Sequence, residues 1–396
     1  MAGPDPQAAK RVRPRSRSGR PYRHRPGRIF PSVSRIRRRD IRPCPARMAS
    51  RVSKAGRAHA PEGSLSGRRR HTSGAGRSNF DAVGTHSGTL DLGRFGFNAP
   101  IPPGGYRWLY ADAFSDDGRF GLILIALIGS VFSPYYAWSG RGRPENHCAL
   151  NVGLYGGGKT RWVMTERKED AIDRGNDHFT FGPSSVRFEG DRLVFDIREH
   201  AAPIPFPVRG QITVRPEVQQ EQQFTLDPNG RHAWRPVWPK ARVSAKFDQP
   251  GLDWSGDGYV DMNAGLEPLE AGFKSWSWAR TAMPDGAAIL YDCQPAGGGE
   301  HGLALRIHPD GSTTHFQAPP KIDLPPVMWG VARPSRSDGE GRVVKTLEDT
   351  PFYTRSMIET ELLGERRISM HESLDLKRFS STWVKCLLPF RMPRAF

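Results

Sequence analysis

Three short segments decide the fold class of this chain: RLVFDI (192–197), GQITVRP (210–216) and ARVSAKFD (241–248). Each is a brief apolar run, and turn-forming Gly, Pro, Asn and Asp residues separate such runs, which is typical of β-strands joined by tight turns. AAILYDC (287–293) and LALRIHP (303–309) show the same sequence pattern nearer the C-terminus. Helical periodicity is scarce, so we predict an all-β protein.

The longest apolar run is FGLILIALIGSVF (120–132). A helix needs about 20 residues to cross a bilayer, so we interpret these 13 residues as a strand pair or one long buried strand. No transmembrane segment is predicted. A lipid substrate would therefore have to be met from outside the bilayer.

Charge divides the chain into two parts. Residues 1–80 carry 22 basic side chains and three acids, a formal charge of +19, whereas the rest carries 36 basic and 38 acidic side chains. We predict that residues 1–88 form a disordered, arginine-rich leader, because so little apolar surface cannot offset the entropy of ordering. An inert tail, a weak anchor to anionic lipid and a nucleic-acid arm stay open as its roles. The near-neutral remainder predicts no nucleic-acid partner.

A domain division is expected at Pro250-Gly251, where a strand ends and a stretch rich in Gly and Asp begins. It separates an N-terminal β-domain (89–251) from a C-terminal β-domain (252–396). The two halves show no internal sequence repeat.

Motifs for metal, redox and nucleophilic chemistry are missing from the sequence. The four cysteines form no Cys-x-x-Cys pair, which favours a reducing cytoplasm, and no H-E-x-x-H or G-x-S-x-G motif occurs. GLYGGGKT (153–160) does match the phosphate-binding pattern G-x-x-x-x-G-K-[ST]. That mechanism requires the loop to open a helix, and the surroundings are rich in strands, so a plain glycine turn is the favoured interpretation and a nucleotide-binding protein the weaker one.

Aromatic residues interleaved with a few polar groups are the remaining signal. Alternation puts Tyr259, Asp261 and Asn263 on one face of a strand. A carboxyl surrounded by rings would have its pKa raised by desolvation. A solvent-facing strand edge is the competing interpretation for these residues, and ordinary core packing the competing one for the aromatics.

Several blocks of the sequence resemble the carotenoid 1,2-hydratase family, also called hydroxyneurosporene synthase. The resemblance covers roughly Phe97 to Arg394 and does not include the leader. The blocks are GSVFSPYYAWSGR (129–141), PENHC (144–148), FGPSS (181–185), HAWRP (232–236), GDGYVDMNAG (256–265), FKSWSWAR (273–280), TLEDTPFYTRS (346–356), HESLDLKRF (371–379) and PFRMPR (389–394).

The resemblance implies two consecutive lipocalin-like β-domains and a hydro-lyase of carotenoid biosynthesis in photosynthetic bacteria. Such an enzyme adds water to the C1–C2 bond of neurosporene, lycopene or related acyclic carotenoids, on the way to spheroidene or spirilloxanthin. Its partners would be carotenoid and water. Its expected place is the cytoplasm, in peripheral contact with the inner or intracytoplasmic membrane. A non-enzymatic lipocalin-like carrier of a hydrophobic ligand is the alternative.

Protonation of this alkene at C2 leaves a cation at C1, so the reaction needs an acid, ring faces and one water, and neither a redox cofactor nor a metal. Asp261 is the expected proton donor, with Tyr259 and Asn263 orienting it or the water. His147 with Glu145 is the competing acid. The aromatic residues expected to bind substrate are Tyr135, Tyr136, Trp138, Trp254, Trp276 and Trp278.

Overall fold

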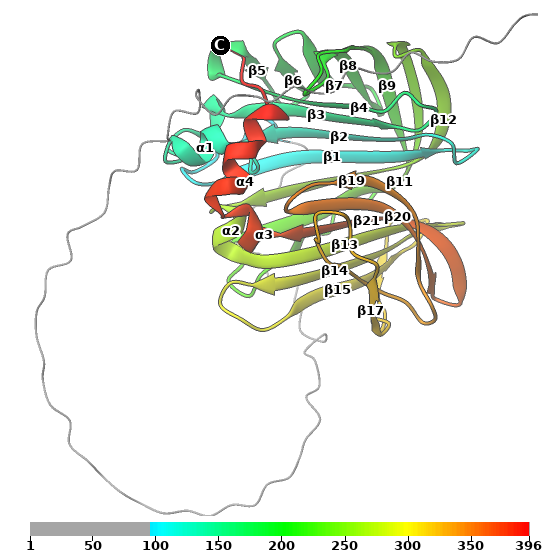
Figure 1. Ribbon diagram of the computed structural model, residues 1–396. Helices are drawn as coiled ribbons and strands as arrows, with labels where there is room; N and C mark the ends of the chain where they lie inside the picture. Colours follow the sequence, from blue (N-terminus) through cyan, green and yellow to red (C-terminus); the bar gives the residue numbers. More distant parts are fainter. Residues whose placement is uncertain (1–95, 396) are drawn as a thin grey trace, which may run out of the picture. The chain divides into compact units, whose positions relative to one another are not determined.

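Eleven strands of the N-terminal half curl into a nearly closed antiparallel barrel, shown in the upper part of Figure 1. The computed structural model describes residues 96–395, so the predicted leader (1–88) lies outside the described residues. Neighbours in the sheet follow the order β4-β3-β2-β1-β12-β11-β9-β8-β7-β6-β5, and the short β10 pairs with β11. The strands are β1 (Tyr106–Ser115), β2 (Gly121–Ile128), β3 (Cys148–Tyr155), β4 (Arg161–Arg167), β5 (Ile172–Arg174), β6 (His178–Phe181), β7 (Ser184–Glu189), β8 (Arg192–His200), β9 (Pro207–Val218), β10 (Phe224–Thr225), β11 (His232–Gln249) and β12 (Leu252–Gly265).

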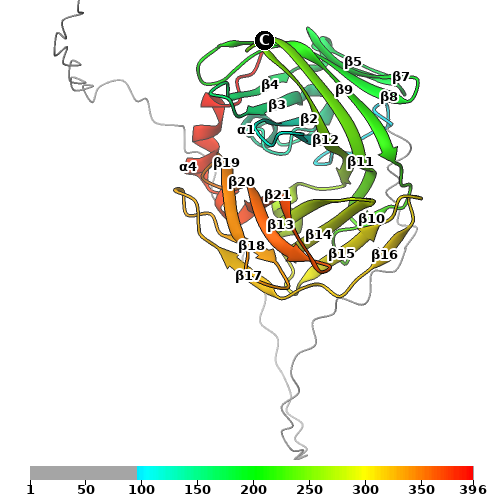
Figure 2. The same cartoon turned by 90° about the vertical axis from the view of Figure 1, so that its right-hand side faces the viewer.

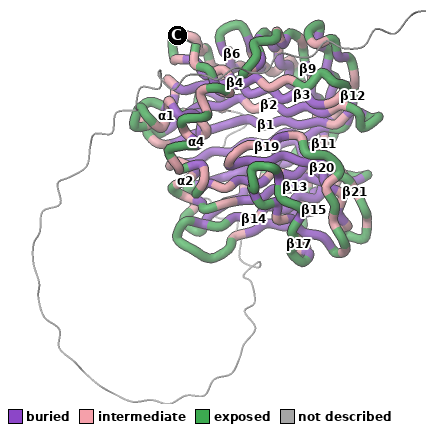
Figure 3. The backbone as a smooth tube through the Cα atoms, viewed as in Figure 1, coloured by how far each residue is buried: buried purple, intermediate pink, exposed green. Residues whose placement is uncertain are grey.

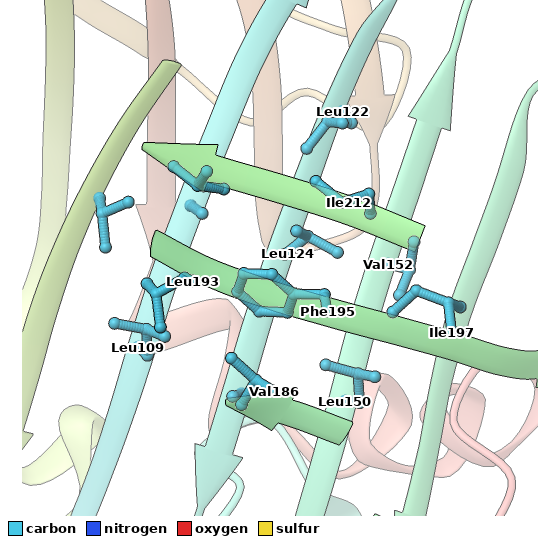
Figure 4. Close-up of a cluster of buried hydrophobic side chains, with 14 of the residues drawn as sticks. Leu109, Leu122, Leu124, Leu150, Val152, Val186, Leu193, Phe195, Ile197 and Ile212 are labelled. Atoms are coloured by element: carbon cyan, nitrogen blue, oxygen red, sulfur yellow. The ribbon is translucent and has the colours of Figure 1, made fainter. Parts of the chain in front are cut away.

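The barrel interior is a packed hydrophobic core. Leu124 of β2, Phe195 of β8 and Ile212 of β9 meet there (Figure 4), and each is at most 1% exposed. Burying such a side chain contributes about 1.5–3 kcal/mol. Because successive side chains of a strand point to opposite faces, Leu109 of β1 joins this core whereas Tyr110 belongs to a second cluster outside the barrel.

The C-terminal half forms a second antiparallel sheet, which lies against the barrel's outer face (Figure 2). Its order is β16-β15-β14-β13-β21-β20-β19, and β17 and β18 form a separate pair. The strands are β13 (Phe273–Met283), β14 (Gly286–Pro295), β15 (His301–Ile307), β16 (Thr313–His315), β17 (Lys321–Leu324), β18 (Arg333–Arg336), β19 (Arg342–Asp349), β20 (Tyr353–Leu362) and β21 (Glu365–Asp375).

Between the barrel and the second sheet lies a layer of mostly aromatic side chains, which we call the intersheet layer. It joins outward-facing residues of β1, β11 and β12 to residues of β13, β14, β20 and β21. Figure 3 shows the strands on both sides of this layer as mainly buried. The second sheet therefore gives the barrel's outer face a dry environment.

The few helices are short, and α1 to α4 lie on one side of the molecule (Figure 1). In the described part of the chain no helix has the length and apolar character needed to cross a membrane. The helices are α1 (Pro134–Trp138), α2 (Leu269–Gly272), α3 (Leu376–Phe379) and α4 (Thr382–Leu387), and the 3₁₀ turns are η1 (Pro144–Asn146), η2 (Glu169–Ala171) and η3 (Leu388–Phe390).

The predicted all-β class is confirmed. The apolar run 120–132 contains β2, one buried strand, rather than a pair. The expected domain division at 251/252 falls in the turn between β11 and β12, and both of these strands belong to the barrel sheet. The change from the first sheet to the second comes later, between Gly265 and Phe273.

Candidate active site

Three residues of β12 point together into the intersheet layer. Tyr259, Asp261 and Asn263 are 0%, 4% and 3% exposed, respectively. Tyr259 donates its hydroxyl to Asp261 Oδ2 (2.9 Å), and Asn263 Nδ2 donates to Asp261 Oδ1 (3.4 Å). The three side chains therefore share one face, as their alternation in the sequence predicts, and this face is buried rather than solvent-facing.

Asp261 is a carboxyl that burial holds protonated at neutral pH. Desolvation raises its pKa to about 8, against the lowering effect of hydrogen bonds from Trp234 Nε1 and Tyr259. Both of these groups donate to Oδ2, Trp234 at 2.9 Å. Since Oδ2 accepts two hydrogen bonds at 2.9 Å and Oδ1 accepts only one longer bond, from Asn263 at 3.4 Å, we place the acid proton on Oδ1.

The second sheet supplies the wall that faces Asp261. Trp276 and Trp278 of β13 and Tyr291 of β14 line a cavity of about 30 Å³ together with Asp261 and Asn263. Such a volume suits a water molecule. The remaining lining residues are Trp108, Tyr110 and Glu372.

Two polar atoms of the cavity residues have no hydrogen-bond partner among residues 96–395: the side-chain Oδ1 of Asn263 and the indole Nε1 of Trp278. Buried polar groups are almost always hydrogen-bonded, to protein or to water. One is an acceptor and the other a donor, so together they suit a water molecule held beside Asp261.

Glu372 of β21 also lines the cavity, although no motif in the sequence predicts a role for it. Its Oε1 accepts hydrogen bonds from Arg355 Nε (2.8 Å) and from the hydroxyl of Tyr110 (2.9 Å). Arg355 is 1% exposed, so the two form a largely buried ion pair. Strand pairing brings these groups together. In the barrel, Tyr110 of β1 lies opposite Asp261 of β12. In the second sheet, Glu372 of β21 lies between Trp278 of β13 and Arg355 of β20.

A second buried ion pair, between Asp112 and Arg280, lies beside Tyr259. Both side chains are at most 3% exposed, and the Arg280 guanidinium lies 5.6 Å from the centre of the Tyr259 ring. The alternation Tyr106, Trp108, Tyr110, Asp112 in β1 is the sequence signal that could have identified this face.

Trp254 does not belong to the wall around Asp261, contrary to the sequence-based expectation. It lies on β12, but its even position turns it to the opposite face, where it packs against the barrel core and stacks on Phe120 at 6.5 Å. A strand separates its two faces, so Trp254 cannot contact a cation formed at Asp261.

The competing acid, His147, has a different setting. Its Nδ1 is 2.8 Å from Glu166 and its Nε2 3.1 Å from the Ser139 hydroxyl. Glu145 is bound instead to Arg174 at 3.1 Å, so the expected His147–Glu145 pair is not formed. Neither residue lines the cavity at Asp261.

The aromatics of α1 are also away from that cavity. Tyr136 is buried and donates its hydroxyl to the Gly105 carbonyl (2.8 Å), which anchors the helix. Tyr135 packs edge-on against Trp138 at 5.8 Å, and Trp138 is 56% exposed. Of the six expected substrate-binding aromatics, the structure brings only Trp276 and Trp278 to Asp261.

The apparent phosphate loop is the turn between β3 and β4. Gly156, Gly157 and Gly158 all have positive φ, and an antiparallel strand follows them instead of a helix. The Lys159 ammonium donates to the Gly251 carbonyl. The geometry for holding a phosphate at a helix N-terminus is therefore missing from this loop. Among residues 96–395, no three His, Cys, Asp or Glu side chains group as a metal site.

These features define an all-β protein with a buried carboxyl of raised pKa in an aromatic site, outside the barrel rather than within it. The crystal structure of an AttH-like protein from Nitrosomonas europaea has a similar fold, with a TM-score of 0.51 and 15% identity over 74% of this chain and 98% of that chain.

Sequence relatives give the family. Residues 124–396 match the family described as carotenoid hydratase CrtC. The acyclic carotenoid 1,2-hydratase of Thiocapsa roseopersicina is 45% identical over 94% of this chain and 93% of its own length. That of Rubrivivax gelatinosus is 45% identical over 75% of each chain. The chain belongs to the carotenoid hydratase CrtC family, and the hydro-lyase class predicted from the sequence is confirmed.

Proposed function

We propose that this protein adds water to the terminal C1–C2 double bond of acyclic carotenoids, and that Asp261 supplies the proton. The observation that carries the mechanism is a carboxyl with a pKa of about 8, buried among aromatic rings beside a cavity of water size. The family supports the overall reaction. The residue roles rest on the geometry.

The first step is proton transfer from Asp261 Oδ1 to C2 of the alkene. The new C–H bond forms from the π electrons, and the tertiary carbon C1 is left with the positive charge. Trp234 and Tyr259 stabilise the carboxylate that remains, because both donate to Oδ2. A protonated acid near neutral pH is what general acid catalysis requires.

The cation is stabilised by its surroundings. Ring faces attract positive charge, and Trp276, Trp278 and Tyr291 stand opposite Asp261. The Asp261 carboxylate formed in the first step and the Glu372 carboxylate add electrostatic attraction. An end group needs more room than the cavity of about 30 Å³, so we expect the tryptophan side chains to move when it binds.

Water then attacks C1, and the proton it releases must return to Asp261 for the next turnover. Asn263 Oδ1 and Trp278 Nε1 are placed to hold that water. Glu372, on the same cavity, is the carboxylate that can pass the proton on. The net reaction consumes one alkene and one water, and no electrons are transferred.

A polyene substrate partitions into the hydrocarbon of a membrane. We infer that the protein meets the inner or intracytoplasmic membrane from the cytoplasmic side, as a peripheral protein, and takes the end group into the intersheet layer. Among residues 96–395, no helix is long and apolar enough to cross a membrane.

The test is incubation of the purified full chain with neurosporene or lycopene in detergent, in D₂O, followed by mass analysis. The expected product is heavier by one heavy water and carries one deuterium on carbon C2. A hydrophobic carrier would return the pigment unchanged, and this result would refute the proposed reaction.

A further inference from the structure

Five large apolar side chains are exposed next to one another on the side where the helices lie. Met328 (88% exposed) and Trp329 (39%) lie in the loop between β17 and β18, and Trp383 (47%), Leu387 (41%) and Phe390 (69%) belong to α4 and η3. The rings of Trp329 and Trp383 stack at 6.3 Å, which joins the two groups. We call these five residues the apolar patch.

The helical segment of the patch is apolar on both faces. Val384 of α4 and Met392, which follows η3, are at most 2% exposed. Trp383, Leu387 and Phe390 follow the spacing i, i+4, i+7, which puts them on one side of a helix, and this side is exposed. A surface helix normally presents polar residues outward, so this outward face indicates a partner.

The segment that carries α4 and η3 is basic, although at the other side of the patch the Asp349 carboxylate accepts hydrogen bonds from the Met328 and Trp329 amides. Residues 376–396 contain five Lys and Arg side chains and no Asp or Glu. Lys377 is exposed, and Arg378 donates to the Trp329 carbonyl (2.8 Å), which holds a cation against the patch. Lys385 contacts Glu270 at 3.7 Å with its side chain still 19% exposed. Tryptophans bordered by Lys and Arg match the interface of an anionic bilayer, where rings lie at headgroup level.

We propose that the apolar patch docks this protein on the surface of an anionic lipid bilayer. The inference rests on the proposed function, since a carotenoid has to be taken from a membrane. Trp383, Leu387 and Phe390 enter the interface, and the basic side chains contact lipid phosphates.

The patch stands at an end of the layer that contains the site. Behind α4, the Lys385 ammonium lies 5.6 Å from the Phe379 ring, and Phe379 packs on Phe352 at 4.9 Å. Next to Phe352, the ring of Tyr353 lies 5.1 Å from the Arg355 guanidinium, which binds Glu372 at the cavity. Side-chain contacts, aromatic up to the Arg355–Glu372 ion pair, thus connect the docking side to the cavity.

The test compares three full-length proteins in flotation with phosphatidylcholine–phosphatidylglycerol vesicles. They are the wild type, a patch variant (Trp383→Ser, Leu387→Ser, Phe390→Ser) and a control variant (Ile204→Ser, Phe206→Ser, Leu363→Ser). The control removes apolar side chains that are 60%, 49% and 40% exposed elsewhere, a close match to the patch. Salt at about 1 M shortens the Debye length to about 3 Å. It screens the basic N-terminal residues that all three proteins share and the basic side chains at the patch, so at this salt concentration the comparison measures the apolar contribution of the patch.

We expect the patch variant to partition at least about tenfold less than the wild type, and the control within a few-fold of it. Brominated lipid should quench tryptophan fluorescence of the wild type and the control but much less that of the patch variant. A patch variant that floats like the wild type would overturn the proposal. So would a wild-type dimer that becomes monomeric in the patch variant while vesicle binding is unchanged, because the patch would then bind a second copy.

Turnover of detergent-dispersed lycopene separates this proposal from the proposed function. All three proteins should hydrate it at similar rates, because the substituted residues lie outside the cavity. A wild type that floats but forms no product would refute the reaction and leave the docking surface in place.

Discussion

Replacing Asp261 with asparagine removes the acid proton, together with the long hydrogen bond that Oδ1 accepts from Asn263 Nδ2. The amide has the same size, and its carbonyl can accept the hydrogen bonds that Trp234 and Tyr259 donate to Oδ2. The alkene then has no proton donor, so turnover should fall at least about a hundredfold, the lower end for general acid catalysis. Substrate binding should persist, because the aromatic wall is unchanged.

The same substitution should stabilise the fold at neutral pH. The pKa of Asp261 is raised from 3.8 to about 8. A folded-state pKa above the unfolded value gives a contribution to stability that is complete below about pH 3.8 and is lost as pH rises toward 8. At pH 7 this loss is on the order of 4 kcal/mol as an upper bound. Asparagine does not titrate, so the variant's advantage should grow between pH 5 and pH 7.5.

Two assays measure these effects: product formation from lycopene by mass analysis, and urea unfolding at the two pH values. His147→Gln is the control for the competing acid, and it should retain turnover. The assignment would be refuted if His147→Gln abolished turnover while Asp261→Asn stayed within a few-fold of the wild type. A variant less stable than the wild type at both pH values would contradict the protonated carboxyl.

Three further predictions concern the pH dependence of turnover, Glu372 and the glycine turn at Lys159. Wild-type turnover should decline above about pH 8, since the protonated fraction of Asp261 falls from about 0.9 at pH 7 to about 0.1 at pH 9; a rate that rises through this range would contradict it. Glu372→Gln should lower the unfolding free energy by roughly 3–5 kcal/mol, because it leaves the buried Arg355 unpaired, and should reduce turnover, whereas Glu372→Asp should restore part of both in urea unfolding and product assays. Lys159→Ala should leave turnover nearly unchanged, and ATP should not raise the melting temperature; micromolar ATP binding that the variant loses would revive the nucleotide interpretation.

The sequence by itself determined the fold class, the family and the shared face of Tyr259, Asp261 and Asn263. Turn residues and short apolar runs indicate β-strands wherever they occur. Alternation within a strand depends only on backbone geometry, so it holds before any partner is known. For the same reason, the alternation already implies that the side chain of Trp254, at an even position, lies on the other face of the strand from that of Asp261, at an odd position.

The tertiary structure alone decided which face of β12 meets the second sheet, and therefore which residues join Asp261. Glu372 and Arg355 are about a hundred residues from Asp261 in the chain, and only the pairing of β20, β21 and β13 aligns them with Trp278. Local sequence cannot specify that alignment, because it depends on which strands become neighbours. Hydrophobic side chains fill the barrel interior, so the site lies on the barrel's outer face. There the second sheet covers Asp261, and the resulting desolvation raises the pKa of its carboxyl.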